Sequence, residues 1–278
     1  MNHLCVIGDP VDHSLSPVMH NAAIGALGLE REYAYGALRV SNDELGSFIG
    51  SMRNGSVAGA SVTMPHKEAV LPFLDDISGM AGKCRAVNTV TLEKGIVTGH
   101  NTDGEGCVNA LREAGAEPEG RKVVILGAGG AARAIAFALC DQKVQSVHVI
   151  NRSEARARML ADSIGSAAAI HGGEGKITEA MQDADIIINA TSAGMIGPAA
   201  GQSPVPSELI GGGMTVMDIV YQPLETRLLT EARMAGARTV DGLGMLVHQG
   251  AIQFELFTGK EAPVNVMREA ILEILSEE

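Results

Sequence analysis

The chain has 278 residues and a formal net charge of −12, with a pI near 5.1, 46% hydrophobic residues and 19% charged residues. A chain of this length and composition can bury enough apolar surface for one large domain or two smaller ones. Its acidic balance argues against nonspecific nucleic-acid binding, which depends on basic patches.

No run of about 18 apolar residues occurs, and residues 1–10 lack the basic-then-apolar opening of a signal peptide. The four cysteines form no C-x-x-C pair, and the eight histidines form no H-x-x-x-H pair. We therefore expect free thiols in a cytoplasmic protein, with no membrane association and no metal site.

Strand-like and helix-like segments alternate along the first part of the chain, which predicts α/β architecture with a parallel sheet. In chain order we expect a strand over 3–8, a helix over 16–28 capped by Ser16 with Pro17 at its first position, and a strand over 31–40. There follow a helix opened by a capping box of Ser41 and Glu44, a strand over 57–64 ended by Pro65, a hairpin over 86–103 with Lys94 and Gly95 at its turn, and a helix over 103–115.

The stretch VVILGAGGAARAIAFAL, residues 123–139, predicts a buried strand, a glycine turn and a helix. Gly127, Gly129 and Ala132 match the dinucleotide fingerprint G-x-G-x-x-G/A. Gly127 permits the tight turn, Gly129 removes a side chain where a pyrophosphate approaches, and Ala132 lets the helix pack against the sheet. The free N–H groups at the helix N-terminus then face the phosphates. The stretch therefore predicts a nucleotide site, against the alternative of an ordinary strand–helix turn.

The remaining elements continue the alternation. They are a strand over 146–151, a helix over 153–165, strands over 185–192 and 215–221, a helix over 225–236, a strand over 238–242, and two apolar-periodic helices over 244–258 and 264–276. The last two helices could close the nucleotide domain or fold back on the first domain. We predict an α/β domain over 1–102 and a doubly wound, Rossmann-type domain over 103–243, with the active site in a cleft between them.

The end of the second strand of the nucleotide domain indicates which dinucleotide binds. NAD-binding folds usually place an Asp or Glu there to hold the ribose hydroxyls, but this chain has Asn151, followed by Arg152, Ser153 and Arg156. A neutral side chain beside a guanidinium and a hydroxyl suits a 2′-phosphate. Glu154 argues mildly the other way, and a helix cap with surface arginines is the alternative. We predict NADP.

Polar residues follow several strands of the first domain, where ligands collect in open α/β sheets. Ser14 and Ser16 precede a helix N-terminus and form a natural pocket for a carboxylate. Thr63 and Lys67 follow the third strand. The alternatives are that Ser16 is only a helix cap and that Lys67 is solvated.

Two further candidates are Asn88 and Asp103, although Asp103 alone would be read as a helix cap. An Asn and an Asp suit substrate alcohols, and a Lys/Asp pair suits proton transfer. Together with NADP, these groups predict hydride transfer between an alcohol and a ketone on a small polyhydroxy acid.

The ordered motifs resemble those of the shikimate dehydrogenase family over nearly the whole chain. They are G-x-P-x-x-H-S-x-S-P-x-x-H-N at 8–21, V-T-x-P-x-K at 62–67, A-V-N-T at 86–89, N-T-D-G at 101–104, G-A-G-G-A at 127–131, N-R-S at 151–153, N-A-T-S at 189–192, D-x-V-Y-x-P at 218–223 and D-G-L-G-M-L-V-x-Q at 241–249. The resemblance implies reduction of 3-dehydroshikimate to shikimate by NADPH, on the path to chorismate and the aromatic amino acids. It also implies that helices within 244–278 complete the first domain.

The resemblance carries roles to individual positions. For the substrate it implies Lys67 and Asp103 as the catalytic pair, with Ser14, Ser16, Thr63, Asn88, Tyr221 and Gln249 as binding residues. For NADP it implies Gly127, Ala128, Gly129, Gly130, Ala131, Asn151, Arg152, Ser153, Arg156, Thr191, Ile219, Gly242 and Met245. The expected partners are this substrate and cofactor, in a monomer or homodimer.

Two departures stand out. Ser61 occupies a position where the family usually has Asn, which weakens the expectation at the substrate edge, and Ile219 replaces a frequent Met. A quinate/shikimate dehydrogenase using NAD or NADP is the close alternative, to be separated around Ser14, Ser16 and Tyr221. A noncatalytic NADP-sensing module is the distant one, and it should have lost Lys67 or Asp103.

Overall fold

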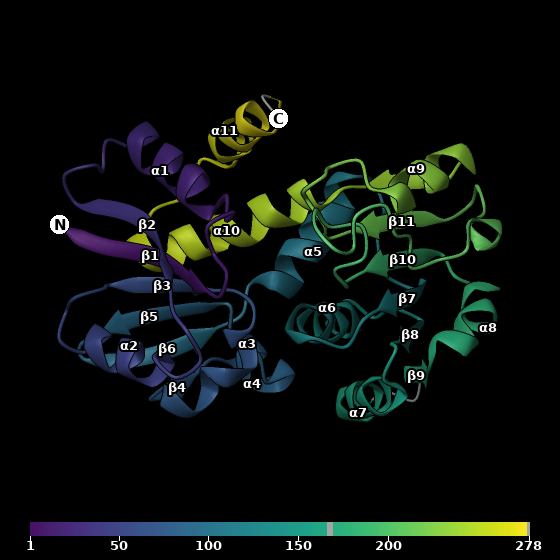
Figure 1. Ribbon diagram of the computed structural model, residues 1–278, viewed down its shortest axis with the longest axis horizontal. Helices are drawn as coiled ribbons and strands as arrows, with labels where there is room; N and C mark the ends of the chain where they lie inside the picture. Colours follow the sequence, from purple (N-terminus) through teal and green to yellow (C-terminus); the bar gives the residue numbers. More distant parts are fainter. Residues whose placement is uncertain (166–168, 277–278) are drawn as a thin grey trace. The chain divides into compact units, whose positions relative to one another are not determined.

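The computed structural model describes residues 1–165 and 169–276. The chain divides into two compact units: residues 1–103 with 247–278, and residues 104–246. Each unit contains one six-stranded sheet with helices packed against it (Figure 1).

The first unit contains the N-terminal strands and the C-terminal helices. Its elements are β1 (Asn2–Gly8), α1 (Ser16–Ala26), β2 (Tyr33–Arg39), α2 (Leu45–Met52), β3 (Gly59–Val62), α3 (His66–Ala69), η1 (Leu71–Phe73), β4 (Asp76–Ile77), α4 (Gly79–Cys84), β5 (Thr89–Glu93), β6 (Ile96–His100) and α11 (Val264–Ser276). The helices α5 (Asp103–Glu113) and α10 (Gly242–Thr258) each contain residues of both units.

The first sheet is mixed, in the order β2-β1-β3-β5-β6-β4. β1 pairs in parallel with β2 and β3, whereas β5 is antiparallel to both β3 and β6. The expectation of a parallel sheet therefore does not hold in this unit, because β5 and β6 form the predicted hairpin. That hairpin is confirmed: Lys94 and Gly95 take φ values of 51° and 82° at its turn, the positive values that a two-residue hairpin turn requires.

Alternating strand residues supply the two faces of this sheet. On one face the buried core includes Ile7 and Val62 from the strands and Ile49 from α2. The opposite face carries α1 and α10 (Figure 1), and α1 also packs on α11. A Cβ at Gly250 would lie 3.0 Å from Sδ of Met19, so α10 and α1 approach closely at a glycine. This packing places the C-terminal helices on the first unit.

Two predicted helix caps differ from the structure. α1 begins at Ser16, its N-cap position is Leu15, and no side chain caps it, so the prediction of Ser16 as the cap is wrong. Pro17 does lie in the first turn, where its missing N–H costs nothing. At α2, the Glu44 carboxylate accepts the N–H and hydroxyl of Ser41, which is half of the predicted capping box.

The second unit is a doubly wound parallel domain. Its elements are β7 (Lys122–Leu126), α6 (Gly130–Asp141), β8 (Ser146–Ile150), α7 (Glu154–Ile164), β9 (Ala169–Gly172), η2 (Glu174–Lys176), α8 (Ile177–Met181), β10 (Ile186–Asn189), η3 (Ser207–Leu209), β11 (Thr215–Asp218), α9 (Arg227–Met234) and β12 (Arg238–Val240). All neighbouring strands are parallel, in the order β12-β11-β10-β7-β8-β9. The strand order reverses direction at β7, so the loops after β7 and β10 flank the switch point where such sheets bind ligands.

Most predicted elements of this unit are present within one to three residues of their predicted ends. The short elements β9 and α8 were not predicted, and neither were β4 and α4 in the first unit. Among the residues that the structure describes, no helix combines the length and apolar character needed to span a bilayer.

Candidate active site

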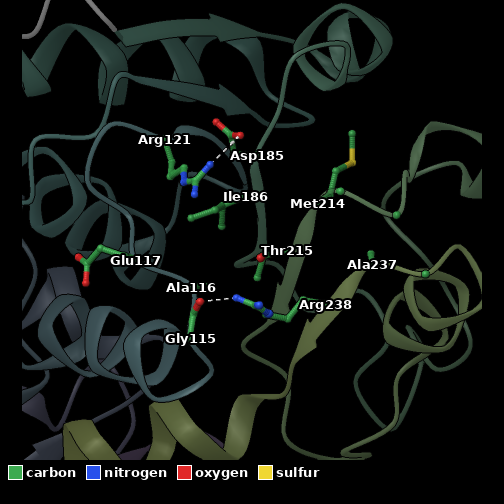
Figure 2. A pocket seen from close by; sticks show the side chains of 13 residues that line it. Gly115, Ala116, Glu117, Arg121, Asp185, Ile186, Met214, Thr215, Ala237 and Arg238 are labelled. Atoms are coloured by element: carbon green, nitrogen blue, oxygen red, sulfur yellow. Dashed lines mark hydrogen bonds and ion pairs between the residues drawn. The ribbon is translucent and has the colours of Figure 1, made fainter.

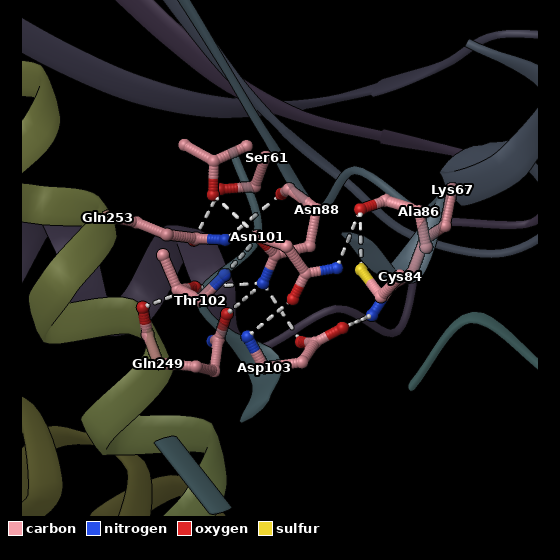
Figure 3. Close-up of polar contacts among 11 residues, drawn as sticks. Ser61, Lys67, Cys84, Ala86, Asn88, Asn101, Thr102, Asp103, Gln249 and Gln253 are labelled. Atoms are coloured by element: carbon pink, nitrogen blue, oxygen red, sulfur yellow. Dashed lines mark hydrogen bonds and ion pairs between the residues drawn. The ribbon is translucent and has the colours of Figure 1, made fainter. Parts of the chain in front are cut away.

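Lys67 and Asp103 form an ion pair in the first unit, with Nζ 2.5 Å from Oδ2 (Figure 3). Their side chains are 19% and 4% exposed. Lys67 lies on α3, which follows β3, and Asp103 is the first residue of α5, which follows β6. A lysine solvated on a surface helix would not be held in this way, so the structure favours the pairing over the solvated alternative.

The strand register explains why residues distant in sequence meet here. Ile7 pairs with Val62 in parallel, and Ser61 pairs with Thr89 in antiparallel register. Thr89 in turn pairs with His100. The segments that follow β1, β3 and β6 therefore emerge at one edge of the sheet, together with the segment that precedes β5.

Asn88 is the centre of this edge and is 2% exposed. Its Oδ1 accepts the N–H of Thr102 at 2.9 Å and the hydroxyl of Thr89 at 2.8 Å. Those two donors fix the amide orientation, so Nδ2 faces Oδ1 of Asp103 at 2.9 Å and Oγ1 of Thr102 at 2.8 Å. The Asp103 carboxylate is thus held on one oxygen by Asn88 and on the other by Lys67.

Asn101 and Thr102 complete the support. The Asn101 side chain accepts the N–H of Asp103 at 3.0 Å and donates to the carbonyl of Ala86 at 2.8 Å. The hydroxyl of Thr102 donates to the carbonyl of Gln249 at 3.0 Å. The sequence did not predict these supporting roles of Asn101 and Thr102, although both residues belong to the N-T-D-G motif. Local sequence does not indicate which side chains meet across the edge of a sheet.

The other predicted substrate residues of this unit lie near the same edge. Thr63 is half-buried directly after β3, and a Cβ at Gly8 would lie 2.5 Å from its methyl group. The hydroxyl of Ser14 accepts the N–H of Ser16 at 3.3 Å. Gln249 lies on α10, where its Oε1 is 3.3 Å from Nδ2 of Asn88. Their contacts with a substrate stay predictions.

In the second unit the glycine turn has the shape that the fingerprint predicts. Gly127 has φ +114°, and a Cβ there would lie 2.8 Å from the carbonyl oxygen of Ala190, so only glycine fits. A Cβ at Gly129 would meet nothing within 4 Å, which leaves open space on that side. Within the described ranges, the N–H groups of Gly129, Gly130 and Ala131 at the start of α6 have no acceptor. Free donors at a helix N-terminus suit phosphate.

The end of β8 has an exposed basic loop. Asn151 donates to the carbonyl of Ser153 at 3.0 Å, and Ser153 is the N-cap residue of α7, although its side chain makes no capping bond. Arg152 and Arg156 are exposed, and Arg152 makes no hydrogen bond or ion pair with a described residue. No carboxylate occupies the position that would hold the ribose of NAD.

Further predicted cofactor residues come together at the ends of β10 and β11. Thr191 bonds through its N–H and hydroxyl to Oδ1 of Asn189, at 3.0 and 2.7 Å. A Cβ at Gly242 would lie 2.6 Å from the carbonyl oxygen of Ile219, so the chain passes Ile219 closely there. Met245 is buried. Tyr221, a predicted substrate residue, follows β11 in the same unit, and burial raises the pKa of its hydroxyl.

A cavity of about 560 Å³ opens elsewhere in the second unit (Figure 2). Ile186, Thr215 and Arg238, at the amino ends of β10, β11 and β12, line it. The fingerprint glycines lie at the carboxyl end of β7, so the cavity is at the opposite edge of the parallel sheet. It is not the dinucleotide site.

Comparisons with known proteins agree with these features. Three family models match successive parts of the chain: shikimate dehydrogenase substrate binding domain at residues 6–90, shikimate/quinate 5-dehydrogenase at 110–199, and shikimate 5′-dehydrogenase C-terminal domain at 242–272. The shikimate dehydrogenase (NADP(+)) of Methanopyrus kandleri is 46% identical over 281 residues, covering 99% of this chain and 96% of the relative. The chain belongs to the shikimate dehydrogenase family.

Solved structures in this family share the fold closely. Shikimate 5-dehydrogenase from Thermus thermophilus, in complex with NADP(H) and shikimate, has a TM-score of 0.89 at 38% identity, covering 98% of this chain and 99% of that one. Quinate dehydrogenase from Corynebacterium glutamicum, in complex with NAD, has a TM-score of 0.89 at 36% identity, with the same coverage. Backbone similarity alone therefore does not separate the two substrate preferences within the shikimate dehydrogenase family.

For metals, the side chains of the described ranges contain no group of three or more His, Cys, Asp and Glu that could hold an ion. The four cysteines, Cys5, Cys84, Cys107 and Cys140, are free thiols. At the sheet edge of this member of the shikimate dehydrogenase family, Lys67 and Asp103 form an ion pair, and their role in proton transfer stays a prediction.

Proposed function

We propose that the protein is an NADP-dependent shikimate dehydrogenase, which reversibly reduces 3-dehydroshikimate to shikimate on the path to chorismate and the aromatic amino acids. The ion pair of Lys67 and Asp103, at 2.5 Å with side chains 19% and 4% exposed, carries the proposal. The pair follows the carboxyl ends of β3 and β6, where ligands bind in open α/β sheets. All of the proposed substrate residues except Tyr221 belong to the first unit, and the proposed NADP residues belong to the second.

The protein's own groups orient the ketone and supply its proton. The Ser14 and Ser16 hydroxyls, with Tyr221, bind the substrate carboxylate, while Thr63, Asn88 and Gln249 bind ring hydroxyls. Lys67 Nζ donates a proton to the carbonyl oxygen as the hydride reaches the carbonyl carbon, which leaves an alcohol. Asp103 holds Nζ in position and stabilises its charge before transfer. In shikimate oxidation the neutral Lys67 amine takes the proton back, while Asp103 stabilises the ammonium that forms.

The second unit fits NADP on two observations. The Gly127 turn excludes any side chain, and the N–H groups of Gly129, Gly130 and Ala131 are unused. These groups, with Ala128 and Thr191, would hold the pyrophosphate, while Ile219, Gly242 and Met245 would line the nicotinamide. NADPH supplies the hydride, and the chain supplies position and electrostatics.

We propose that Asn151, Arg152, Ser153 and Arg156 bind the 2′-phosphate. The exposed guanidinium of Arg152, which has no partner among the described residues, can form a charge-assisted, bidentate bond to phosphate without first breaking another contact. This favours NADP over NAD. We also place the enzyme in the cytoplasm, where free thiols persist, as a monomer or homodimer.

The deciding experiment compares initial rates of the purified enzyme with shikimate and with quinate, each with NADP⁺ and with NAD⁺. We expect the highest kcat/KM for shikimate with NADP⁺. Faster quinate oxidation would instead identify a quinate/shikimate dehydrogenase. Cofactor binding without turnover of either substrate would identify a noncatalytic NADP-sensing module.

A further inference from the structure

A chain of buried side chains joins the edge strand β2 to Asn88 in the first unit. The hydroxyl of Tyr35 donates to Oγ of Ser61 at 2.6 Å, and Ser61 Oγ donates to Oε1 of Gln253 at 2.6 Å. Gln253 Nε2 donates to the main-chain carbonyl of Asn88 at 3.0 Å. Tyr35, Ser61 and Gln253 are 5%, 4% and 2% exposed, so none of them faces solvent.

The Asn88 carbonyl, at one end of this chain of hydrogen bonds, determines which group donates in each of the other bonds. The Asn88 carbonyl can only accept, and it already accepts the N–H of Val62 at 2.7 Å. Gln253 must therefore present its NH₂ group to Asn88 and its oxygen to Ser61. Ser61 must then donate to Gln253 and accept from Tyr35. No alternative arrangement satisfies all four groups, which makes the chain a single ordered unit.

Gln253 and Gln249, which lies one turn earlier on α10, both contact Asn88. The two glutamines are four positions apart and so share a helix face. Gln253 holds the main chain of Asn88, while Gln249 Oε1 lies 3.3 Å from its side-chain Nδ2. α10 thus contacts Asn88 at both its main-chain carbonyl and its side-chain amide (Figure 3).

The position of Asn88 in turn affects the position of Asp103, because Asn88 Nδ2 donates to Asp103 Oδ1 at 2.9 Å. We propose that Gln253 is a positioning residue for the Lys67–Asp103 pair, acting through Asn88, and that Ser61 sets the orientation of the Gln253 amide. The proposal rests on the proposed function, in that the quantity positioned is the catalytic carboxylate. It also gives Ser61 a role inside the protein and away from ligand.

The test replaces Gln253 by a side chain of similar length without hydrogen-bonding groups. Gln253→Met should lower kcat for shikimate oxidation about tenfold, because a small misplacement of a catalytic group is costly. The KM for NADP⁺ should stay within about twofold. Ser61→Ala should show a smaller loss of kcat. Ser61→Thr, which keeps the hydroxyl, should have a kcat closer to that of the wild type than Ser61→Ala has. Ile49→Val, in the apolar core of the same unit, is the control that lowers Tm without touching the chain.

A second readout does not depend on activity. The N–H of Thr102 donates to Asn88 Oδ1, so amide hydrogen exchange of residues 86–103 should quicken more in Gln253→Met than in Ile49→Val, which lowers stability without changing these contacts. A folded Gln253→Met enzyme with normal kcat and normal exchange would overturn the positioning role, as would a rise confined to the KM for shikimate. If Gln253→Met does not fold, Ser61→Ala against Ser61→Thr decides by the same measures. An inactive wild-type protein would overturn the proposed function alone, since exchange still tests the contacts of α10 with Asn88.

Discussion

Each unit contains a buried aspartate bonded to an asparagine amide, and the two differ in their counter-charge. In the first unit Asp103 accepts from Asn88 and pairs with the Lys67 ammonium. In the second unit Asp218 accepts from Asn189 at 2.9 Å and from the Thr226 hydroxyl at 2.8 Å. No cation among the described residues pairs with Asp218.

The difference separates the proposed catalytic pair from a carboxylate that connects structural elements. Asp218 Oδ1 also accepts the N–H of Val220 at 3.0 Å, so this one carboxylate joins β10, the end of β11 and the start of α9. Burial without a counter-charge raises its pKa to about 6, against the lowering effect of its three hydrogen bonds. Asp103 instead pairs with the Lys67 ammonium, the group proposed to donate a proton to the substrate.

The largest effect is expected at Lys67. Lys67→Ala should lower kcat by roughly 10²–10⁴-fold, because the ketone oxygen loses its proton donor. NADP⁺ binding should survive, since the residues proposed to hold it lie in the other unit. Steady-state rates and cofactor titration check both parts. A folded Lys67→Ala enzyme with near-normal kcat would remove Lys67 from the mechanism and make the pair structural, like Asp218.

Asp103→Asn sharpens the same comparison, because it keeps size and hydrogen bonding while removing the charge. It should also lower kcat, and the double variant should be little worse than the poorer single one if the residues act as a unit. Thermal melts must accompany these rates, since Asp103 begins α5 and its loss costs about 1 kcal/mol if it stabilises that helix end.

At Asp218 we expect an effect on stability and its pH dependence. The folded-state pKa is raised from 3.8 to about 6, so the folded protein holds a proton that the unfolded chain has lost. The corresponding stability is present below about pH 4 and is lost as the pH rises to about 6, by about 3 kcal/mol. Asp218→Asn cannot ionise and should lack this part of the decline. Urea unfolding of both proteins from pH 4 to pH 8 should show the variant gaining on the wild type with pH, and parallel curves would contradict the assignment.

Local rules predicted a large part of this fold. The hairpin followed from Lys94-Gly95, the nucleotide turn from Gly127 and Gly129, and the end of β3 from Pro65. The unpredicted β9 and α8 are only four and five residues long, too short for a periodic pattern to identify. The antiparallel place of β5 beside β3 depends on tertiary pairing that no local pattern encodes.

The candidate site divides in the same way. Lys67 and Asp103 were predicted as a pair because each follows a strand, and the sheet register then brought them together. Ser61 was judged by its difference from the family and was expected to weaken the substrate edge. The structure turns its hydroxyl to Gln253, 192 positions away in sequence, which no spacing argument could anticipate.

A smaller effect is expected at Arg152, which has no partner among the described residues, unlike Asp103 and Asp218. Arg152→Ala should weaken the binding of NADP⁺ by roughly 1.5–3 kcal/mol and leave the binding of NAD⁺ almost unchanged, because only NADP⁺ carries the 2′-phosphate. Arg158→Ala is the matched control: it lies on α7, the helix that follows Arg152, and its partner is Asp162 at 3.7 Å. Equal losses for both cofactors in KM would contradict the 2′-phosphate role.

The smallest effects are expected at the carboxylate pocket of the first unit. Ser14 is half-exposed and its hydroxyl already accepts the N–H of Ser16, which is itself buried, and each serine supplies only one neutral donor. Ser14→Ala and Ser16→Ala should each raise the KM for shikimate by about 2- to 12-fold, equivalent to about 0.5–1.5 kcal/mol, with NADP⁺ unaffected. Ser41→Ala, which removes a hydroxyl bonded to Glu44 in the same unit, is the control and should leave the KM unchanged. Shikimate methyl ester gives the independent check, because a neutral ester should be a poor substrate of the wild type and should lose little more in either variant. An ester used as well as shikimate would place the carboxylate elsewhere and leave Ser14 as a residue of the loop before α1 and Ser16 as the first residue of that helix.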